Sequence, residues 1–327
     1  MDFPNSWATP KVSHTEADWW VGTFYGFARV ADPDAVKATM VSAIGKDPVY
    51  GTILVAEEGA NGTLCAPTRA MLDETLGRLS AEIGLSAGFD PTWSRVDRPI
   101  FRKLKVQVKK EIVTFKTPEA TPLEGEGGTH LGPDDWNELI SDPDTIIIDT
   151  RNSFETKVGT FPGAIDPGNV SFSEFPAFVE EQLRGQEGKK VAMFCTGGIR
   201  CEKASSYLQQ QGFGEVHHLR GGILKYLEQV PEAESRWQGE CFVFDQRVAL
   251  NHRLEPGEHS LCHACGLPVS AQQRELPSYI KGVQCVHCVD RFSDADRERF
   301  AMRQRQIDQR QIDQRQIDQH NIDQQQA

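Results

Sequence analysis

The chain of 327 residues lacks the features that mark membrane and secreted proteins. It has no apolar run close to the roughly 20 residues that a membrane-spanning helix needs. Its N-terminus, MDFPNSWATPKV, has no basic region followed by an apolar one, so a secretory signal is not indicated. We therefore expect a cytoplasmic protein with no membrane partner. The sequence defines no oligomeric state.

Two cofactor signatures are also missing. No glycine-rich dinucleotide fingerprint is present, so no nucleotide cofactor is evident. No set of two histidines and one carboxylate stands out in the sequence as an iron site. Redox chemistry that depends on these groups is therefore not indicated by any motif.

Positive charge is scarce. The chain carries 35 lysines and arginines against 47 aspartates and glutamates, which gives a net charge of -12. This balance argues against general, nonspecific binding of nucleic acid. It leaves room for a local basic face, so the distribution of charge matters more than its sum.

Composition divides the first two thirds of the chain into an α+β and an α/β domain, within an α/β multidomain protein. Residues 19–115 read as β-α-β-β-α-β, the order of a ferredoxin-like (acylphosphatase-like) domain, with FRKLKVQVKKEIVTF as a long last strand. A linker rich in Pro, Gly and Glu follows at 116–130. Residues 131–232 alternate short β-branched strands with helices, which predicts a parallel sheet covered on both faces.

The rest of the chain is a cysteine-rich module at 239–300 and a repetitive tail at 301–327. The module contains CHAC and CVHC, whose spacing is typical of a four-thiolate zinc ribbon. The expected ligands of this structural zinc are Cys262, Cys265, Cys285 and Cys288, with unligated reduced thiols as the alternative. In the tail, isoleucine recurs at every fifth residue, so no helix face collects them, and we expect disorder.

The stretch VAMFCTGGIRCEK carries the strongest chemical signal. An apolar strand ends at Cys195, and the usable crevice of a parallel sheet lies at the carboxyl ends of its strands. The backbone N–H groups of the turn and the N-terminus of the next helix stabilise a thiolate, and Arg200 adds positive charge that can also bind an oxyanion. The expected anion-binding loop is Thr196, Gly197, Gly198 and Ile199. Cys195 and Arg200 are thus the expected catalytic residues.

Cys201 lies in the first turn of that helix. We interpret it as a packed thiol, because this is the commoner fate of a cysteine at such a position. The alternative is a resolving role, in which Cys201 forms a disulfide with Cys195.

Several motifs resemble those of rhodanese domains, namely IIIDTRNSFE, GTFPGAI, CTGGIRCEKAS and HHLRGGILKYL. Together with EGANGT, KLKVQVKKEIV and the cysteine-rich end, they make residues 19–290 resemble the bacterial rhodanese-containing tRNA uridine hydroxylases. The resemblance implies hydroxylation of the tRNA wobble uridine to 5-hydroxyuridine, with molecular oxygen as co-substrate. It also places Cys195 at the position that carries a persulfide in the rhodanese superfamily.

A lysine-rich face supports an RNA partner. In the expected strand FRKLKVQVKKEIV, Lys103, Lys105 and Lys109 fall on one face, with Arg102 nearby. A ferredoxin-like sheet that packs its other face on helices presents this face to solvent, where lysines can contact phosphates. The alternative is that alternating lysines only keep an exposed sheet edge soluble.

Two other functions compete with tRNA hydroxylation. The first is a thiosulfate-type sulfurtransferase that works through a persulfide on Cys195, which the loop chemistry fits equally well. The second is a non-catalytic RNA-binding or regulatory module with a redox-sensing thiol. The lysine face discriminates between them, because a thiosulfate enzyme does not need it.

Overall fold

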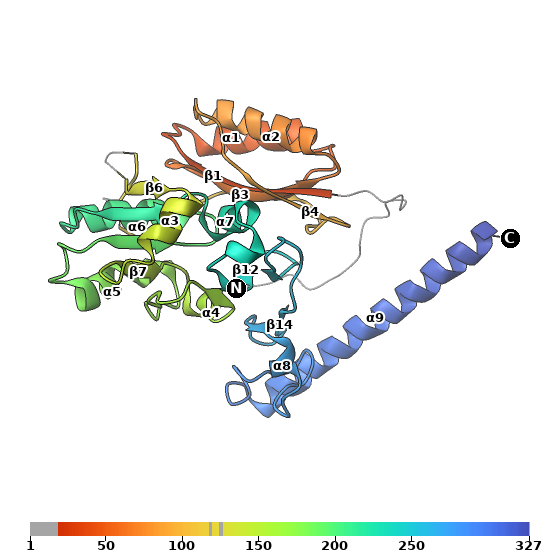
Figure 1. Ribbon diagram of the computed structural model, residues 1–327. Coiled ribbons are helices and arrows are strands. Elements are labelled where there is room, and N and C mark those ends of the chain that lie inside the picture. Colours follow the sequence, from red (N-terminus) through yellow and green to blue (C-terminus); the bar gives the residue numbers. More distant parts are fainter. Residues whose placement is uncertain (1–18, 118–119, 124–126, 327) are drawn as a thin grey trace. The chain divides into compact units, whose positions relative to one another are not determined.

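The computed structural model describes residues 19–117, 120–123 and 127–326 (Figure 1). The chain divides into two compact units, with the boundary between Gly257 and Glu258. The first unit contains two α/β sheets, and the second contains the cysteine-rich segment and a long helix. In the described part of the chain, no helix has the length and apolar character needed to cross a membrane.

The N-terminal sheet of the first unit has five strands in the order β4-β1-β3-β2-β5. Its elements are β1 (Trp19–Phe27), α1 (Pro33–Ile44), β2 (Tyr50–Ala56), β3 (Gly59–Ala66), α2 (Arg69–Glu82), β4 (Thr92–Val96) and β5 (Leu104–Val108). Helices α1 and α2 lie on one face (Figure 1). Phe24, Met40, Ile53 and Leu72 are among the buried side chains between this face and the helices.

The prediction that residues 101–115 form one long last strand is wrong. The fourth strand of the β-α-β-β-α-β unit is β4, which pairs antiparallel with β1. The lysine-rich run forms only the five-residue β5, which pairs parallel with β2 at the opposite edge. The run leaves the sheet because Ile112 and Phe115, 1% and 0% exposed, are buried beyond it, Phe115 in the core of the following domain.

The second sheet has four parallel strands in the order β6-β10-β9-β7. Its strands are β6 (Thr129–Leu131), β7 (Ile146–Asp149), β9 (Val191–Phe194) and β10 (Val216–Leu219), and its helices are α3 (Pro133–Leu139), α4 (Ser153–Thr156), α5 (Phe175–Phe178), α6 (Ile199–Gln210) and α7 (Gly222–Gln229). Short 3-10 turns at Phe172–Glu174 and Glu232–Glu234 and a π-helix at Val179–Leu183 complete the helices.

Both faces of this sheet are covered, as the sequence predicts. Along β9, Val191 and Met193 pack in one core with residues of α5 and α6. Ala192 and Phe194 point the other way and pack with residues of α3 and α7. A continuous apolar strand of this kind is the pattern of a parallel sheet buried on both sides.

The uncovered face of the N-terminal sheet packs on the second sheet's domain, and this differs from the solvent exposure expected. Lys203 on α6 donates to Glu58 at 2.8 Å, and Asn61 on β3 donates to the carbonyl of Ile112 at 3.1 Å. Helix α7 packs against β4. That face carries apolar side chains, including Trp19 and Val21, which are 3% and 1% exposed. Burial of apolar surface favours covering such a face.

Short strand pairs end the first unit. Strand β8 (Gly159–Thr160) pairs with β11 (Gln238–Gly239), and β12 (Cys241–Phe242) pairs with β13 (Ala249–Leu250).

The second unit is built around four cysteines and a helix. Its elements are β14 (Ser260–Leu261), β15 (Pro268–Val269), α8 (Ala271–Arg274) and α9 (Asp294–Gln326). The expected disorder of residues 301–327 is not what the structure shows, because α9 runs through Gln326. Ser293 caps the helix by accepting from the N–H of Asp296, and no glycine or proline interrupts it afterwards.

Candidate active site

The loop of Cys195 joins β9 to α6 at the carboxyl end of the parallel sheet. Gly198 has a φ of +100°, a conformation that side chains of L-residues rarely adopt, and its N–H donates to Cys195 Sγ at 3.1 Å. The start of α7 closes the other side, since a Cβ on Gly222 would stand 2.4 Å from the Cys195 carbonyl oxygen. The two glycines therefore fold the loop tightly around the thiol.

This environment favours the thiolate form of Cys195. Burial raises the pKa of the thiol, but a hydrogen bond with the Cys201 thiol, the charge of Arg200 and the backbone N–H groups of Arg200 and Cys201 outweigh it and lower the pKa to about 6. A buried thiolate needs such donors, because it has lost its water shell. The chemistry available at this position is nucleophilic attack by sulfur.

Cys201 is fully buried and its Sγ lies 3.6 Å from the Thr150 hydroxyl. Burial and the neighbouring Cys195 raise the pKa of Cys201 well above its usual value, so it stays protonated. A protonated, buried Cys201 fits the packed thiol expected from the sequence, and its thiol favours the thiolate form of Cys195.

Arg200 is not directed at open space. Both terminal nitrogens of its guanidinium donate to Glu155, each at 2.9 Å, and the two side chains are 9% and 0% exposed. Glu155 lies in α4, where it also accepts from the backbone N–H of Asn152 in a capping box. The hydrogen bonds of Arg200 thus serve Glu155 rather than the oxyanion expected from the sequence, while its charge still acts on Cys195.

The N-terminal domain contributes Tyr25 to the site. Tyr25 lies on the face of β1 that packs on the second domain, and its hydroxyl stands 2.8 Å from where a Cβ on Gly198 would be. The same hydroxyl donates to Glu202 Oε1 at 2.8 Å. His130 Nε2 lies 2.9 Å from that oxygen.

Sequence reasoning missed Tyr25, Glu155, Glu202 and His130. The N-S-F-E stretch is a capping-box signal that places Glu155, but it says nothing of its partner. Tyr25 and His130 reach Glu202 only through contacts between distant segments, which local patterns do not report. Glu202 itself stands inside the stretch VAMFCTGGIRCEK, next to Cys201.

Ligand atoms of His130, Glu202 and His218 lie within 4.8 Å of one another, so the structure brings together two histidines and a carboxylate that the sequence did not suggest. His218 Nε2, however, lies 3.2 Å from the carbonyl of Gly128, an acceptor that requires the proton on Nε2. Its Nδ1 has no partner among the described residues, whereas metal-bound histidines anchor the second nitrogen. The contacts of His130, Glu202 and His218 are therefore those of a hydrogen-bond network.

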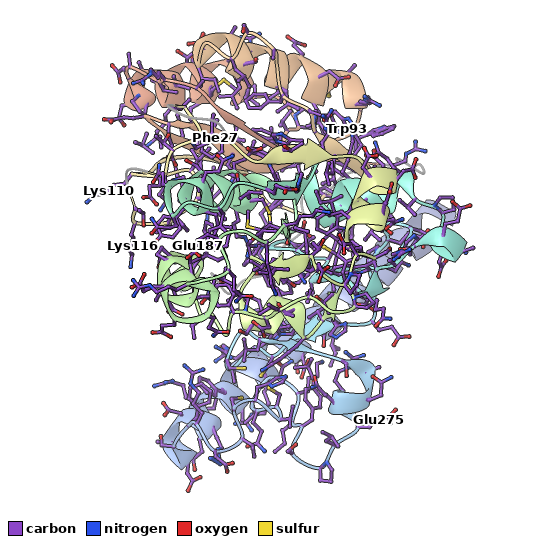
Figure 2. All side chains as sticks on the ribbon, turned by 60° about the vertical axis from the view of Figure 1, so that its left-hand side comes forward. Phe27, Trp93, Lys110, Lys116, Glu187 and Glu275 are labelled. Carbon is purple, nitrogen blue, oxygen red and sulfur yellow. The ribbon has the colours of Figure 1, made fainter. Side chains whose placement is uncertain are left out.

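The expected RNA-binding lysines are exposed. Lys103, Lys105 and Lys109 lie on or beside β5, and Arg102 is half-buried. Lys110, which follows Lys109 in the sequence, stands on the outside of the molecule in Figure 2. Their position on an edge strand fits both a phosphate-binding face and protection of the edge.

The four cysteines of the second unit form a site with the dimensions of a metal centre. The Sγ atoms of Cys262 and Cys288 are 3.9 Å apart, and those of Cys265 and Cys285 are 3.7 Å apart. With bonds of about 2.3 Å from zinc to sulfur, a tetrahedron has edges of roughly 3.8 Å. The cluster therefore has the ligand type and spacing to hold a metal ion.

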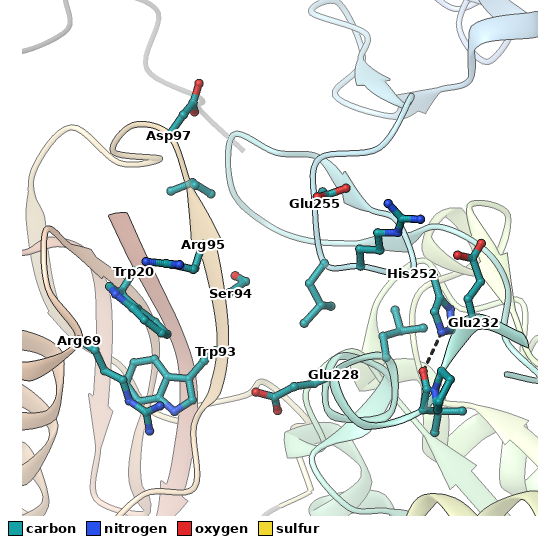
Figure 3. Close-up of a pocket in the computed structure, with 16 residues that line it drawn as sticks. Trp20, Arg69, Trp93, Ser94, Arg95, Asp97, Glu228, Glu232, His252 and Glu255 are labelled. Atoms are coloured by element: carbon teal, nitrogen blue, oxygen red, sulfur yellow. Dashed lines mark hydrogen bonds between the residues drawn. The ribbon is translucent and has the colours of Figure 1, made fainter. Parts of the chain in front are cut away.

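An open pocket of about 1010 Å³ lies between β4 and the end of α7 (Figure 3). Arg69 lies over the ring of Trp93 and Arg95 over that of Trp20, at 4.6 and 4.9 Å from the ring centroids. Acidic side chains such as Glu228 also line it, so its charge is mixed. Its lining does not include the Cys195 loop.

Comparison with known proteins defines the class. Residues 19–112 match the UPF0176 acylphosphatase like domain, and residues 132–229 match the Rhodanese-like domain. The fold and the Cys195 loop are thus those of a rhodanese-like protein with an acylphosphatase-like domain in front.

Whole-chain relatives define the family. The chain is 61% identical to the tRNA uridine(34) hydroxylase of Synechococcus sp. (strain CC9605), over 88% of this chain and 90% of that protein. It is 57% identical to the protein of the same name from Parasynechococcus marenigrum (strain WH8102), over 88% and 92% of the two chains. The chain belongs to the tRNA uridine(34) hydroxylase family. This confirms the family predicted from the Cys195 loop, the upstream motifs and the cysteine-rich end.

Proposed function

We propose that this protein hydroxylates uridine 34 of tRNA, giving 5-hydroxyuridine, with molecular oxygen as co-substrate and Cys195 as the reactive thiolate. Identity of 61% to a protein of that name over most of both chains carries the assignment of activity. The buried, donor-rich environment of Cys195 Sγ supports its role. A tRNA-modifying enzyme of this kind acts in the cytoplasm.

The chemistry of uracil indicates what the thiolate does. C6 is the electrophilic end of the C5=C6 bond, so attack by Cys195 Sγ forms an S–C6 bond and moves the electron pair to C5. C5 is the carbon that gains the hydroxyl group, and it becomes electron-rich towards an oxidant. One atom of O₂ enters this hydroxyl group, and the other leaves as water, which takes two protons and two electrons from a reductant that acts as a further co-substrate. The charge of Arg200, fixed by Glu155, stabilises the thiolate that leaves when the C5=C6 bond is restored.

The test is nucleoside mass spectrometry of tRNA from a deletion strain complemented with the wild type, Cys195→Ser or Cys201→Ser. We expect the wild type to restore 5-hydroxyuridine and Cys195→Ser to abolish it. Cys201→Ser keeps a hydrogen-bond donor and should retain activity. Full restoration by Cys195→Ser removes the thiolate from the mechanism, and loss in both variants equally favours a disulfide pair.

For tRNA binding, we propose the basic edge of Lys103, Lys105, Lys109 and Arg102. The double charge reversal Lys103→Glu/Lys105→Glu should weaken binding and reduce the slope of log K against log salt by about one per lost phosphate contact. Lys37→Glu/Lys46→Glu is the control for net charge, since both of these lysines are exposed and lie outside β5. If both double variants lost the same amount of tRNA binding, the loss would reflect net charge and not the basic edge.

A sulfurtransferase is the second candidate, because the N–H of Gly198 directed at Cys195 Sγ also suits a persulfide. Incubation of the purified protein with thiosulfate and cyanide measures this activity as thiocyanate. Thiocyanate formation at a rate comparable to tRNA hydroxylation would favour the sulfurtransferase. If no thiocyanate forms, the hydroxylase is the remaining candidate.

For the second unit, we propose that Cys262, Cys265, Cys285 and Cys288 hold one structural zinc ion. A closed set of four thiolates leaves no open position for substrate, so its contribution is to folding.

A further inference from the structure

Glu202 is a carboxylate next to the Cys195 loop whose partners come from two domains. It lies on α6, and its side chain is 11% exposed. One oxygen, Oε1, is contacted both by Tyr25 Oη at 2.8 Å and by His130 Nε2 at 2.9 Å. Tyr25 belongs to the N-terminal sheet and His130 to β6, so Glu202 joins them in one hydrogen-bonded path.

One end of this path lies at the thiol loop. The Tyr25 hydroxyl stands over Gly198, whose N–H donates to Cys195 Sγ. The hydroxyl is therefore close to the place that a substrate bonded to Cys195 occupies. The N-terminal domain also places Thr23 near the loop, but Thr23 Cγ2 lies 3.9 Å from a Cβ on Gly197, against 2.8 Å for the Tyr25 hydroxyl and a Cβ on Gly198.

The other end of the path lies at water. The His130 side chain is 40% exposed, in contrast to the buried Glu202 beside it. An imidazole exchanges protons with water readily near neutral pH, because either of its nitrogens can give or accept one. The path thus runs from a buried reaction centre to solvent.

The other groups around Glu202 do not interrupt the path. His218 on β10 lies 3.9 Å from Oε2, and its Nε2 is directed to the Gly128 carbonyl. Burial lowers the pKa of His218 to about 4, so it is neutral. His217 on the same strand opposes a charge on His218. Lys203, next to Glu202 on α6, pairs with Glu58 instead.

We propose that Tyr25, Glu202 and His130 form a proton relay between the Cys195 site and solvent, and that it removes the proton from C5 of the uracil. The proposal rests on the proposed function. In the step, the C5–H bond breaks and its electron pair forms the C5=C6 bond while the C6–Sγ bond breaks and the thiolate leaves. Tyr25 Oη takes the C5 proton and passes its own to Glu202. His130, in the tautomer that carries its proton on Nδ1, accepts the proton of Glu202 at Nε2 and releases the Nδ1 proton to water.

The state of Tyr25 fits this shuttle. Burial and the charge of Glu202 raise the pKa of Tyr25 well above its usual value. A free phenolate is therefore disfavoured, and Tyr25 works by exchanging one proton for another. Burial acts against ionisation of Glu202, but contacts with His130, His218 and Tyr25 outweigh it and lower its pKa, which keeps a carboxylate ready to accept.

The experiment measures single-turnover hydroxylation of tRNA by the full chain in water and deuterium oxide across pH. Tyr25→Phe and Glu202→Gln remove one member each and should lower the rate by about 10²-fold, the lower range for loss of a general acid or base. His130→Ala should lower it less, because water can take up the space of this exposed imidazole. Because His130 is exposed, added imidazole should restore the rate of His130→Ala but not that of Glu202→Gln. Tyr207→Phe, on the same helix as Glu202, is the control and keeps the wild-type rate.

The outcomes separate a relay from a structural role. Slower variants with an altered pH profile and solvent isotope effect, together with imidazole rescue, support the relay. Wild-type rates in Tyr25→Phe and Glu202→Gln, or a loss in His130→Ala that imidazole leaves unchanged, overturn it. If the wild type itself forms no 5-hydroxyuridine, the proposed function fails and the relay fails with it; an active wild type with unaffected variants removes the relay alone.

Discussion

The buried pair of Arg200 and Glu155 offers a quantitative test of how the Cys195 loop is held. Glu155→Gln keeps the shape of the side chain and removes its charge. It leaves the Arg200 guanidinium, whose side chain is 9% exposed, without the carboxylate that accepts both of its hydrogen bonds. The consequence is a cation held away from water with only an amide beside it.

Breaking a buried ion pair in this way costs about 3–5 kcal/mol, and the retained amide oxygen places Glu155→Gln at the lower end of that range. Glu155 also accepts from the backbone N–H of Asn152, a contact that the amide oxygen preserves. The matched control is Glu180→Gln, which removes the same charge from an i,i+4 pair with Arg184 whose side chains are 55% and 72% exposed. Exposed pairs of this kind contribute at most about 1 kcal/mol.

The assay is urea denaturation of the full chain followed by tryptophan fluorescence and by circular dichroism. We expect Glu155→Gln to lower the free energy of unfolding of the first unit by several times the loss in Glu180→Gln. The double variant Glu155→Gln/Arg200→Met removes the stranded cation, and it should recover part of the loss. Equal losses in the two single variants would refute the claim that burial makes the Arg200 pair decisive.

Three further predictions concern the same loop and the cysteine cluster. Because the pKa of Cys195 is lowered to about 6, its alkylation by iodoacetamide, followed by peptide mass spectrometry, should reach half its maximal rate near pH 6. Arg200→Met should move that midpoint upward, and an unchanged midpoint contradicts the role of the guanidinium. Gly198→Ala places a Cβ 2.8 Å from the Tyr25 hydroxyl at a φ of +100° and should destabilise the unit by about 1–3 kcal/mol in thermal melts, so an unchanged melting temperature contradicts the packing. Metal analysis should find one zinc per chain, lost in Cys262→Ser; a metal-free, fully folded wild type contradicts the zinc site.

The sequence predicted those parts of the fold whose signals are local. Strand β9 is four apolar residues followed by Cys195 and two glycines, and this pattern indicates a parallel strand that ends at a functional loop. The cluster of four cysteines follows from the spacing of the two C-x-x-C pairs. The family also followed from short motifs, namely the Cys195 loop read together with EGANGT, KLKVQVKKEIV and the cysteine-rich end.

Two of the predictions that failed depend on contacts between distant segments, and a third concerns the local helix propensity of the tail. The run after Val108 alternates like a strand, but Phe115 is drawn into the core of the next domain, so β5 stops early. Tyr25 reads as one more aromatic in a strand, and only the packing of two domains turns it towards Glu202. For residues 301–327, the lack of an apolar face suggested disorder, but the absence of helix breakers allows α9.

The packing of the N-terminal sheet over α6 limits how this protein can be divided. Lys203, 3% exposed, finds its carboxylate partner in Glu58, and Glu202 finds a donor in Tyr25, both from the preceding domain. A rhodanese-like domain separated from that sheet loses the Glu58 partner of Lys203 and the Tyr25 partner of Glu202, and both charged side chains become exposed to water. The surface of the rhodanese-like domain is therefore built for contact with the N-terminal sheet, and cutting the chain between the two domains should destabilise it.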